Sequence, residues 1–290
     1  MDRWAYWLIA AAAALWGIIA VFVKGLTAYG FSPLQVVAVR VAISAAGLVV
    51  YAAVRDRAAL AVRPADGGYF VGTGIFSVLF FNWCYFTAIE VTSVAIAAVL
   101  LYTAPAIVAV LSMAVFGEAM TARKAAAVAV TFVGCAFVVG VLPAFAGTVS
   151  PSGLLFGLGA GAGYALYSIF GKLALRRYRA LTVTIYTFVV AAAAVLPVSG
   201  LWEQRALFAV WQVWGYALGL GFLSTVLAYL LYTVGLAYVE TSRAAVTATL
   251  EPLVAAAVGA AMFGEALTGW QLAGMALVIA AVAGVQERTG

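Results

Sequence analysis

Glu251 is the residue with the clearest chemical potential, because it is the one carboxylate that lies deep inside an apolar run. The run extends from Ala244 to Phe263, and Pro252 follows the acid directly. A charged acid at the centre of a membrane costs about 2.5–3.5 kcal/mol, so such groups face a cavity or a partner. We predict that Glu251 contacts an amine of a bound molecule or exchanges a proton. The alternatives are a pair with Arg40 and a neutral acid that binds carbonyls freed by Pro252.

Catalytic and metal-binding patterns are missing from the sequence. It contains no histidine, which removes the commonest general base and metal ligand. Cys84 and Cys135 each lie in an apolar run without a partner at a metal-binding or redox spacing, so we predict two buried thiols. An intramembrane enzyme would need a nucleophile–base pair or metal ligands. We therefore predict no enzyme activity, no catalytic residues, no metal and no cofactor.

Aromatic and amide side chains inside the apolar runs form a second group of candidates. Several of them lie at i, i+3 spacing and therefore share a helical face. A buried phenol or amide needs a hydrogen-bond partner, so such faces predict a pocket that stacks and hydrogen-bonds an amphipathic small molecule. Ordinary packing is the alternative for each single tyrosine. The candidate binding residues are Trp16, Asn82, Trp83, Tyr85, Tyr102, Tyr164, Tyr167, Tyr229, Tyr232 and Glu251.

The composition places these residues in a membrane. Hydrophobic residues make up 67% of the 290 positions and charged residues 9%, whereas a soluble domain carries roughly 25% charged residues. Apolar runs of about 20 residues cross a bilayer. Ten runs fit: Ala5–Leu26, Leu34–Val54, Gly68–Ile89, Val94–Phe116, Ala122–Leu142, Gly153–Leu175, Leu181–Leu201, Val213–Ala237, Ala244–Phe263 and Gly269–Val285. We predict an all-α integral membrane protein with ten transmembrane helices in a single bundle.

Basic residues set the orientation of these runs. With the N-terminus inside, twelve of the fifteen Lys and Arg residues fall at cytoplasmic ends, and only Lys24, Arg40 and Arg205 fall on the opposite side. Cytoplasmic loops are enriched in Lys and Arg, so we predict a multi-pass protein of the cell (inner) membrane with two cytoplasmic termini. The same rule accounts for the net charge of +5 without nucleic acid as a partner.

The sequence carries one pattern twice, 147 residues apart. Phe-Gly-Glu-Ala follows Pro105 at the same interval at which it follows Pro252. The run Trp16–Lys24 aligns with Tyr164–Lys172 at an offset of 148. At the offset of 147, four more residues recur in order: Gly72, Gly74, Ser77 and Tyr85 are matched by Gly219, Gly221, Ser224 and Tyr232. We predict two five-helix repeats, residues 1–142 and 153–286, whose odd span number inverts their topology and places a binding site between them.

Other repeated residues have predicted structural roles. Pro105 and Pro252 each remove a backbone hydrogen bond and bend their helices, so we predict kinks that widen a cavity or act as gate hinges. Glu118 and Glu265 fall at span ends on opposite membrane faces, where we predict that they order the turn into the next helix. Thr121 is the predicted N-cap of the helix after Glu118. The structural or ion-pairing candidates are thus Arg40, Glu118 and Glu265.

Together these residues resemble a known family. Ten spans in two halves, a proline in the fourth helix of each half and a Gly-Glu pair that closes it are similar to the drug/metabolite transporter superfamily, in its EamA-type branch. Trp16-Gly17 and Arg40 also fit, and the aromatic-rich helices look similar to the YddG-like exporters of aromatic and other amino acids. The resemblance implies metabolite export across the bacterial inner membrane through a central cavity, without ATP hydrolysis. One departure is Ala104, which stands before Pro105 where Glu251 precedes Pro252.

The predicted function is therefore a secondary transporter that exports small metabolites, above all amino acids including aromatic ones, by alternating access between the repeats. Few ionisable groups lie in the spans, which suits a zwitterion better than a phosphorylated sugar. A nucleotide-sugar or drug transporter is the alternative within this fold, and a non-transporting receptor or structural bundle is the alternative class. The expected partners are the small-molecule substrate and membrane lipid, and a monomer is sufficient.

Overall fold

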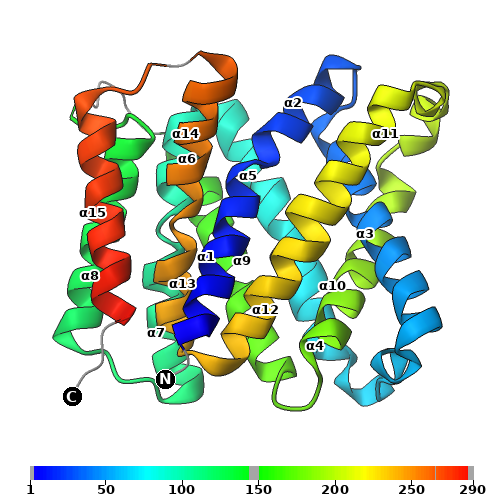
Figure 1. Cartoon of the computed structure of the whole chain (residues 1–290), viewed down its shortest axis with the longest axis horizontal. Helices are drawn as coiled ribbons and strands as arrows, with labels where there is room; N and C mark the ends of the chain where they lie inside the picture. Colours follow the sequence, from blue (N-terminus) through cyan, green and yellow to red (C-terminus); the bar gives the residue numbers. More distant parts are fainter. Residues whose placement is uncertain (1–2, 144–149, 265, 287–290) are drawn as a thin grey trace.

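The chain folds as a bundle of helices, and every regular element in residues 3–143, 150–264 and 266–286, which the computed structural model describes, is helical (Figure 1). The first half contains α1 (Arg3–Gly17), α2 (Ile19–Ala28), α3 (Pro33–Arg55), α4 (Gly67–Val71), α5 (Phe80–Val91), α6 (Val94–Leu101), α7 (Ala104–Phe116) and α8 (Ala122–Val138). The second contains α9 (Pro151–Ala174), α10 (Ala180–Val195), α11 (Trp211–Leu218), α12 (Ala228–Tyr238), α13 (Thr241–Ala248), α14 (Glu251–Phe263) and α15 (Gly269–Gln286). The π-helical segments η3 (Gly72–Leu79) and η6 (Gly219–Leu227) join α4 to α5 and α11 to α12.

Eight helical stretches of the described chain are long and apolar enough to cross a membrane. They correspond to eight of the ten predicted runs. The other two runs form α8, which has 17 residues, and α15, whose apolar part is Gly269–Val285. α8 ends at Val138, earlier than predicted, because the chain turns at Gly140 with a φ of 77°. That left-handed conformation favours glycine and ends the helix.

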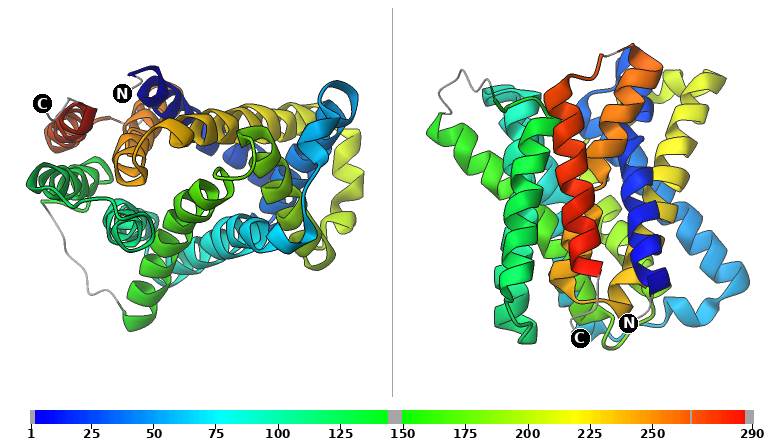
Figure 2. Two further views of the ribbon diagram at one scale, coloured as in Figure 1. Left: turned by 90° about the horizontal axis from the view of Figure 1, so that it is seen from below. Right: turned by 60° about the vertical axis from the view of Figure 1, so that its left-hand side comes forward.

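α8 and α15 form a pair of their own at one edge of the bundle (Figures 1 and 2). Their backbones approach closely, since a Cβ added to Gly274 would lie 2.6 Å from the carbonyl oxygen of Gly134. The rings of Phe137 and Trp270 stack across the pair at 5.3 Å. Small residues at such contacts let membrane helices pack tightly.

Both halves contain a helix that is broken near its middle. α6 gives way to α7 after Leu101, and α13 gives way to α14 after Ala248. Pro105 and Pro252 each occupy the second position of the new helix, where the absent N–H group leaves no helical hydrogen bond unmade. The predicted bends at the prolines are therefore complete breaks. In Figure 1 the two broken helices run in opposite directions, α6–α7 downward and α13–α14 upward.

Equivalent glycines of the two halves make reciprocal contacts. A Cβ on Gly72 would lie 2.4 Å from the ring of Phe170, and a Cβ on Gly219 would lie 2.3 Å from the ring of Phe22. Phe22 and Phe170 are also equivalent in the repeat. A glycine of each half therefore packs against the equivalent phenylalanine of the other half. A second set follows the same rule: Gly74 with Val190, and Gly221 with Ile43. Only glycine leaves room for these close approaches.

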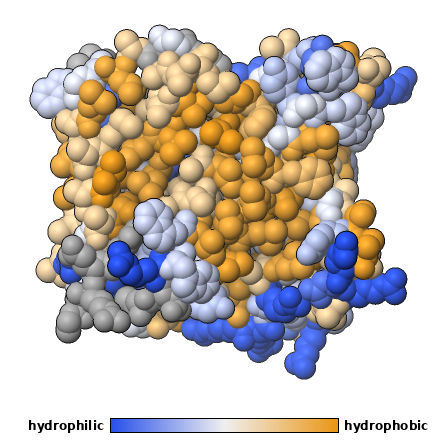
Figure 3. Space-filling view, viewed as in Figure 1, coloured by the Kyte–Doolittle hydropathy of each residue, from blue (hydrophilic) through white to orange (hydrophobic). Residues whose placement is uncertain are grey.

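The surface is apolar over the middle of the bundle. In the face shown in Figure 3, hydrophobic side chains cover the centre, and hydrophilic ones gather mainly along the lower edge, the end at which both termini lie in Figure 1. Large hydrophobic side chains such as Val54 and Trp211 are more than 70% exposed, at 73% and 75%. Exposed apolar area on this scale indicates a lipid-facing surface.

Candidate functional site

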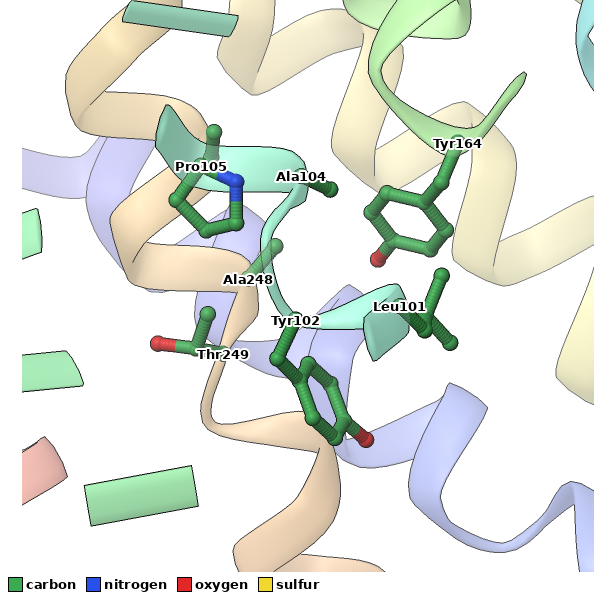
Figure 4. Close-up of a pocket in the computed structure, with 8 residues that line it drawn as sticks. Leu101, Tyr102, Ala104, Pro105, Tyr164, Ala248 and Thr249 are labelled. Atoms are coloured by element: carbon green, nitrogen blue, oxygen red, sulfur yellow. The ribbon is translucent and has the colours of Figure 1, made fainter. Parts of the chain in front are cut away.

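The two helix breaks meet at the centre of the bundle. Tyr164 on α9 faces the break between α6 and α7, with Ala248 and Thr249 of the second break beside it (Figure 4). These residues enclose a small cavity together with Leu101, Tyr102, Ala104, Pro105 and Ala245. Discontinuous helices that meet near a membrane midplane are the usual site of substrate binding in transporters with repeated halves.

Glu251 lies at this meeting point, as the first residue of α14 and midway along the 22-residue stretch from Thr241 to Met262. The Tyr164 hydroxyl donates a hydrogen bond to Glu251 Oε2 at 3.1 Å. The N-terminus of α14 favours a negative charge at this position. A carboxylate accepts several hydrogen bonds, so Glu251 keeps acceptor capacity for a second donor.

The alternative pairing of Glu251 with Arg40 is not what the structure contains. Arg40 Nε donates to the Thr225 hydroxyl at 2.8 Å, and its guanidinium lies 5.8 Å from the ring centre of Tyr229. Among the described ion pairs, none joins Arg40 to Glu251. Arg40 is 8% exposed, and its guanidinium is held by a hydrogen bond and a cation–π contact without an ion pair among those described.

Five predicted aromatic residues gather into one cluster beside Glu251. The ring centres of Trp16 lie 6.2 Å from Tyr164 and 5.2 Å from both Tyr229 and Tyr232, and Tyr167 lies 4.9 Å from Tyr229. They come from α1, α9 and α12 and enclose a second cavity of about 20 Å³. This volume holds about one water molecule, so the cluster is closed in this conformation.

The phenols of the cluster have internal hydrogen bonds. Tyr167 shares one with the Thr233 hydroxyl at 2.7 Å, and Tyr232 shares one with the Ser168 hydroxyl at 2.6 Å. The indole N–H of Trp16 differs, because it is buried and has no partner among the described residues.

Trp83 does not belong to this site, which corrects its assignment as a cavity residue. Its side chain is 59% exposed and packs on Phe80 and Phe156 at the outer surface. It lies on the lipid-facing side of α5, where a tryptophan packs on neighbouring rings without lining a cavity. Asn82 is buried, but its amide donates to the Val78 carbonyl of its own helix at 2.6 Å.

Other predicted residues lie at the margins of the two cavities. Tyr102 lines the cavity between the breaks, and Tyr85 stacks on Phe81 at 5.6 Å. Sequence reasoning missed Phe81, Ser77 and Ser168, which line the aromatic cavity. Ser77, Phe81 and Tyr85 follow each other at intervals of four, and this periodicity could have placed them on one face.

Glu118 closes the end of the bundle that carries the termini. Its carboxylate accepts hydrogen bonds from the Thr241 N–H at 2.6 Å, the Ser242 N–H at 3.1 Å and the Ser242 hydroxyl at 2.7 Å. These groups form the N-terminus of α13, so an acid of the first half caps a helix of the second. Burial raises the pKa of Glu118, but the hydrogen bonds from Ser242 and Thr241 outweigh it and leave that pKa below its ordinary value.

The turn-ordering role predicted for Glu118 is therefore wrong, whereas Thr121 does cap α8 by accepting from the Lys124 N–H at 3.3 Å. Charges around the Glu118 contact reinforce it. Lys124 Nζ lies 3.1 Å from a Glu240 carboxylate oxygen, and Arg243 also binds Glu240. Glu265, the repeat mate of Glu118, lies outside the described residues.

Lys172 adds a second contact at this end. Its Nζ donates to the backbone carbonyls of Leu236 at 2.5 Å and Val239 at 2.8 Å, where α12 ends. A cation is favoured at the C-terminus of a helix. The contact holds α9 to the connection between α12 and α13.

The starts of the two broken helices lie at opposite ends of the bundle and differ in burial. Val94 begins α6 and is 63% exposed, whereas Thr241, its equivalent at the start of α13, is fully buried. Ser93 and Val94 are both exposed, as is Val91, so the difference is not confined to one lipid-facing side of the helix. The start of α13 is thus packed more fully than the equivalent start of α6.

Metal chemistry finds no support in the part of the chain that the structure describes. It contains no group of three or more His, Cys, Asp or Glu side chains that could hold an ion. Cys84 and Cys135 are both buried and free of disulfides.

Comparison with known proteins identifies the family. The chain matches the EamA-like transporter family over residues 3–140 and 151–286, which covers both halves. An uncharacterized transporter of Archaeoglobus fulgidus is 34% identical over 198 residues, which are 68% of this chain and 69% of that protein. A crystal structure superposes with a TM-score of 0.80 over 98% of this chain and 96% of its own, at 18% identity, which shows the fold alone.

Some of the matching relatives have an assigned function, and one of them comes from Escherichia coli. The threonine/homoserine exporter RhtA of strain K12 is 34% identical over 136 residues, which are 47% of this chain and 45% of RhtA. The match thus spans about half of that exporter. These relatives agree with the EamA branch and point to threonine/homoserine exporters rather than specifically to the YddG type.

Proposed function

Because the chain belongs to the EamA-like transporter family, we propose that it exports amino acids by alternating access, without ATP hydrolysis. The observation that carries this proposal is the closed aromatic cluster beside Glu251, at the point where the two broken helices meet. An acid next to apolar rings suits a small molecule with one ammonium group and a modest side chain. The name of the relative RhtA supports the same class of cargo.

The architecture that we propose is ten spans in two inverted repeats, with α8 and α15 as the fifth span of each half. At 1.5 Å per residue the 17 residues of α8 reach about 26 Å, slightly less than the roughly 30 Å of a hydrocarbon core. Local thinning of the bilayer accommodates such a difference. The reciprocal glycine contacts and the opposed broken helices support the inversion.

We propose that the protein lies in the inner membrane of the cell. The end of the bundle that carries both termini then faces the cytoplasm. Arg177 and Arg179 lie at this end, in the connection between α9 and α10, and pair with Asp66 and Asp56. The positive-inside rule supports this orientation. In the structure, the cytoplasmic entrance is then the closed one, held by Glu118 and Lys172.

Alternating access requires that the contacts at the closed end form and break. The cytoplasmic set joins Glu118 to α13, and its release would let the halves rock about the helix breaks. The helical hydrogen-bond ladder is interrupted between α6 and α7 and between α13 and α14, which makes the two breaks suitable hinges.

Flux measurements test the function directly. Protein in liposomes loaded with labelled threonine, homoserine or phenylalanine should release at least one of them down its gradient. If nucleotide sugars or drugs pass and no amino acid does, the proposal is wrong and the protein is a nucleotide-sugar or drug transporter of the same fold. A protein that passes none of these compounds would favour a receptor or structural role.

A further inference from the structure

Trp16 holds a buried polar atom without a partner in the wall of the aromatic cavity. Its side chain is 7% exposed and lines the cavity. Of the cavity-lining side chains that the structure describes, it alone has a buried nitrogen or oxygen without a hydrogen bond. A buried donor that stays unpaired costs free energy, so the position is prepared for an acceptor that the protein itself does not supply.

The repeat explains why the acceptor is missing. Tyr164 is the repeat mate of Trp16, and it gives its hydroxyl to Glu251, the residue before Pro252. In the first half the residue before the equivalent proline is Ala104. At the position equivalent to Glu251, the first half therefore carries a methyl group in place of a carboxylate.

Trp16 and Glu251 belong to the same site. Gly17 brings α1 against the start of α14, since a Cβ at this position would lie 2.8 Å from the Glu251 carbonyl oxygen. Tyr164 connects the two residues, because its ring lies 6.2 Å from Trp16 and its hydroxyl binds Glu251. One lone donor and one acid with spare acceptor capacity therefore border a single group of aromatic rings.

We propose that the indole N–H of Trp16 binds the carboxylate of the transported amino acid, and that Glu251 binds its ammonium group. The inference rests on the proposed function and deepens it, because it states how the site distinguishes the two ends of a zwitterion. An indole N–H donates and cannot accept, so it selects a carboxylate against an ammonium group. An ionised carboxylate only accepts, so Glu251 makes the opposite selection.

The site must widen before it loads. Its volume of about 20 Å³ in the closed conformation matches one water, and a water on the Trp16 N–H would satisfy that donor until substrate replaces it. Movement of the half-helices at the breaks enlarges the space without breaking a continuous helix.

Three ligands that differ by one group test the assignment on the purified full-length protein. Phenylalanine carries both charged groups, phenethylamine lacks the carboxylate and phenylpropionate lacks the ammonium group. Binding is read from thermal stabilisation, and threonine with its decarboxylated counterpart serves as a parallel pair. Trp16→Phe keeps an aromatic ring and removes the donor.

We expect Trp16→Phe to lower the affinity for the amino acid and for phenylpropionate roughly tenfold. The affinity for phenethylamine should change less than about twofold. Glu251→Gln should lower the affinity for phenylalanine and phenethylamine and leave the affinity for phenylpropionate unchanged. Trp83→Phe is the matched control, because the same substitution at the outer surface should leave all three unchanged.

Two results would overturn the assignment. In the first, Trp16→Phe lowers the affinity for all three ligands equally, which means that the indole only packs against them. In the second, it changes none of the affinities, which means that the indole N–H contacts no ligand. If the variant does not fold, the wild-type protein must still bind phenylalanine more tightly than phenethylamine, and equal affinities reject the carboxylate contact. A wild-type protein that binds no amino acid rejects the proposed function itself, which is a separate outcome.

Discussion

Loss of the Glu118 carboxylate should open the closed end of the protein. Glu118→Ala removes three hydrogen bonds that hold the N-terminus of α13, and Glu118→Gln keeps an acceptor but removes the charge. The equivalent helix start at the opposite end, that of α6, is not buried in this way, since Val94 is 63% exposed. The substitution therefore acts on one of the two conformations that alternating access requires.

The size of the effect follows from the number and kind of contacts. A hydrogen bond to a charged group contributes about 1.5–3 kcal/mol, but water replaces part of it once the entrance opens. Loss of an N-cap alone costs about 0.5–2 kcal/mol. We therefore expect Glu118→Ala to disfavour the closed conformation by about 2 kcal/mol, a change of roughly 30-fold in the equilibrium.

A single cysteine at Ala245 reports the opening. Ala245 is 4% exposed, lies one turn into α13 and borders the cavity between the breaks. With Cys84 and Cys135 replaced, a membrane-impermeant thiol reagent is added from the side of the termini. Its reaction rate at position 245 should rise roughly 30-fold in Glu118→Ala, and reaction from the opposite side should fall.

Glu90→Ala is the control, because it removes an exposed acid at the other end of the bundle. The reasoning is refuted if the rate at position 245 stays the same in Glu118→Ala while thermal unfolding shows an intact fold. An equal rise from both sides would also refute it, since that pattern indicates general loosening.

Three further predictions concern Glu118, Glu251 and Gly17. Because the pKa of Glu118 is lowered in the folded protein, its contribution should be complete above the ordinary Glu pKa of about 4.3 and should disappear as the pH falls through the lowered pKa. Acid removes reactive thiolate from every variant, so the measured quantity is a ratio: the thiol reaction rate of wild type should rise relative to that of Glu118→Gln as the pH falls. Glu251→Gln should reduce amino-acid flux at least about tenfold at an unchanged unfolding midpoint; a lower midpoint with normal flux would make the acid structural. Gly17→Ala should destabilise the protein by about 1–3 kcal/mol, because its Cβ would lie 2.6 Å from Val254. Gly215→Ala, whose Cβ meets nothing within 4 Å, is the thermal-unfolding control.

The helices that the sequence predicted correctly are those whose ends carry local signals. Pro105 and Pro252 marked the breaks, and Gly117 and Gly264 end α7 and α14 with the same φ of 69°. Such signals depend on steric limits within a few residues. The π-helical turns η3 and η6 carry no comparable mark, because a single extra residue per turn arises from packing between helices.

Side-chain direction was harder to predict in helices that are apolar on all sides. Trp83 and Trp16 look alike in sequence, yet one faces outward and the other lines the cavity. A buried membrane helix has no polar face from which to deduce its orientation. The partner of Glu118 lies 123 residues away at Thr241, and no local pattern encodes a contact between the two halves.

If the proposed mechanism holds, the repeat divides the site into residues that move the protein and residues that recognise its substrate. Equivalent positions, such as the two prolines and the reciprocal glycines, must serve both conformations, because inversion exchanges the roles of the halves. The proposed substrate has no such symmetry, since an amino acid presents a carboxylate at one end and an ammonium group at the other. Residues that bind the two ends of such a substrate must therefore differ between the halves, as Trp16 differs from Tyr164 and Glu251 from Ala104. The differences between the repeats, rather than their identities, are where substitutions should change the cargo without stopping the motion.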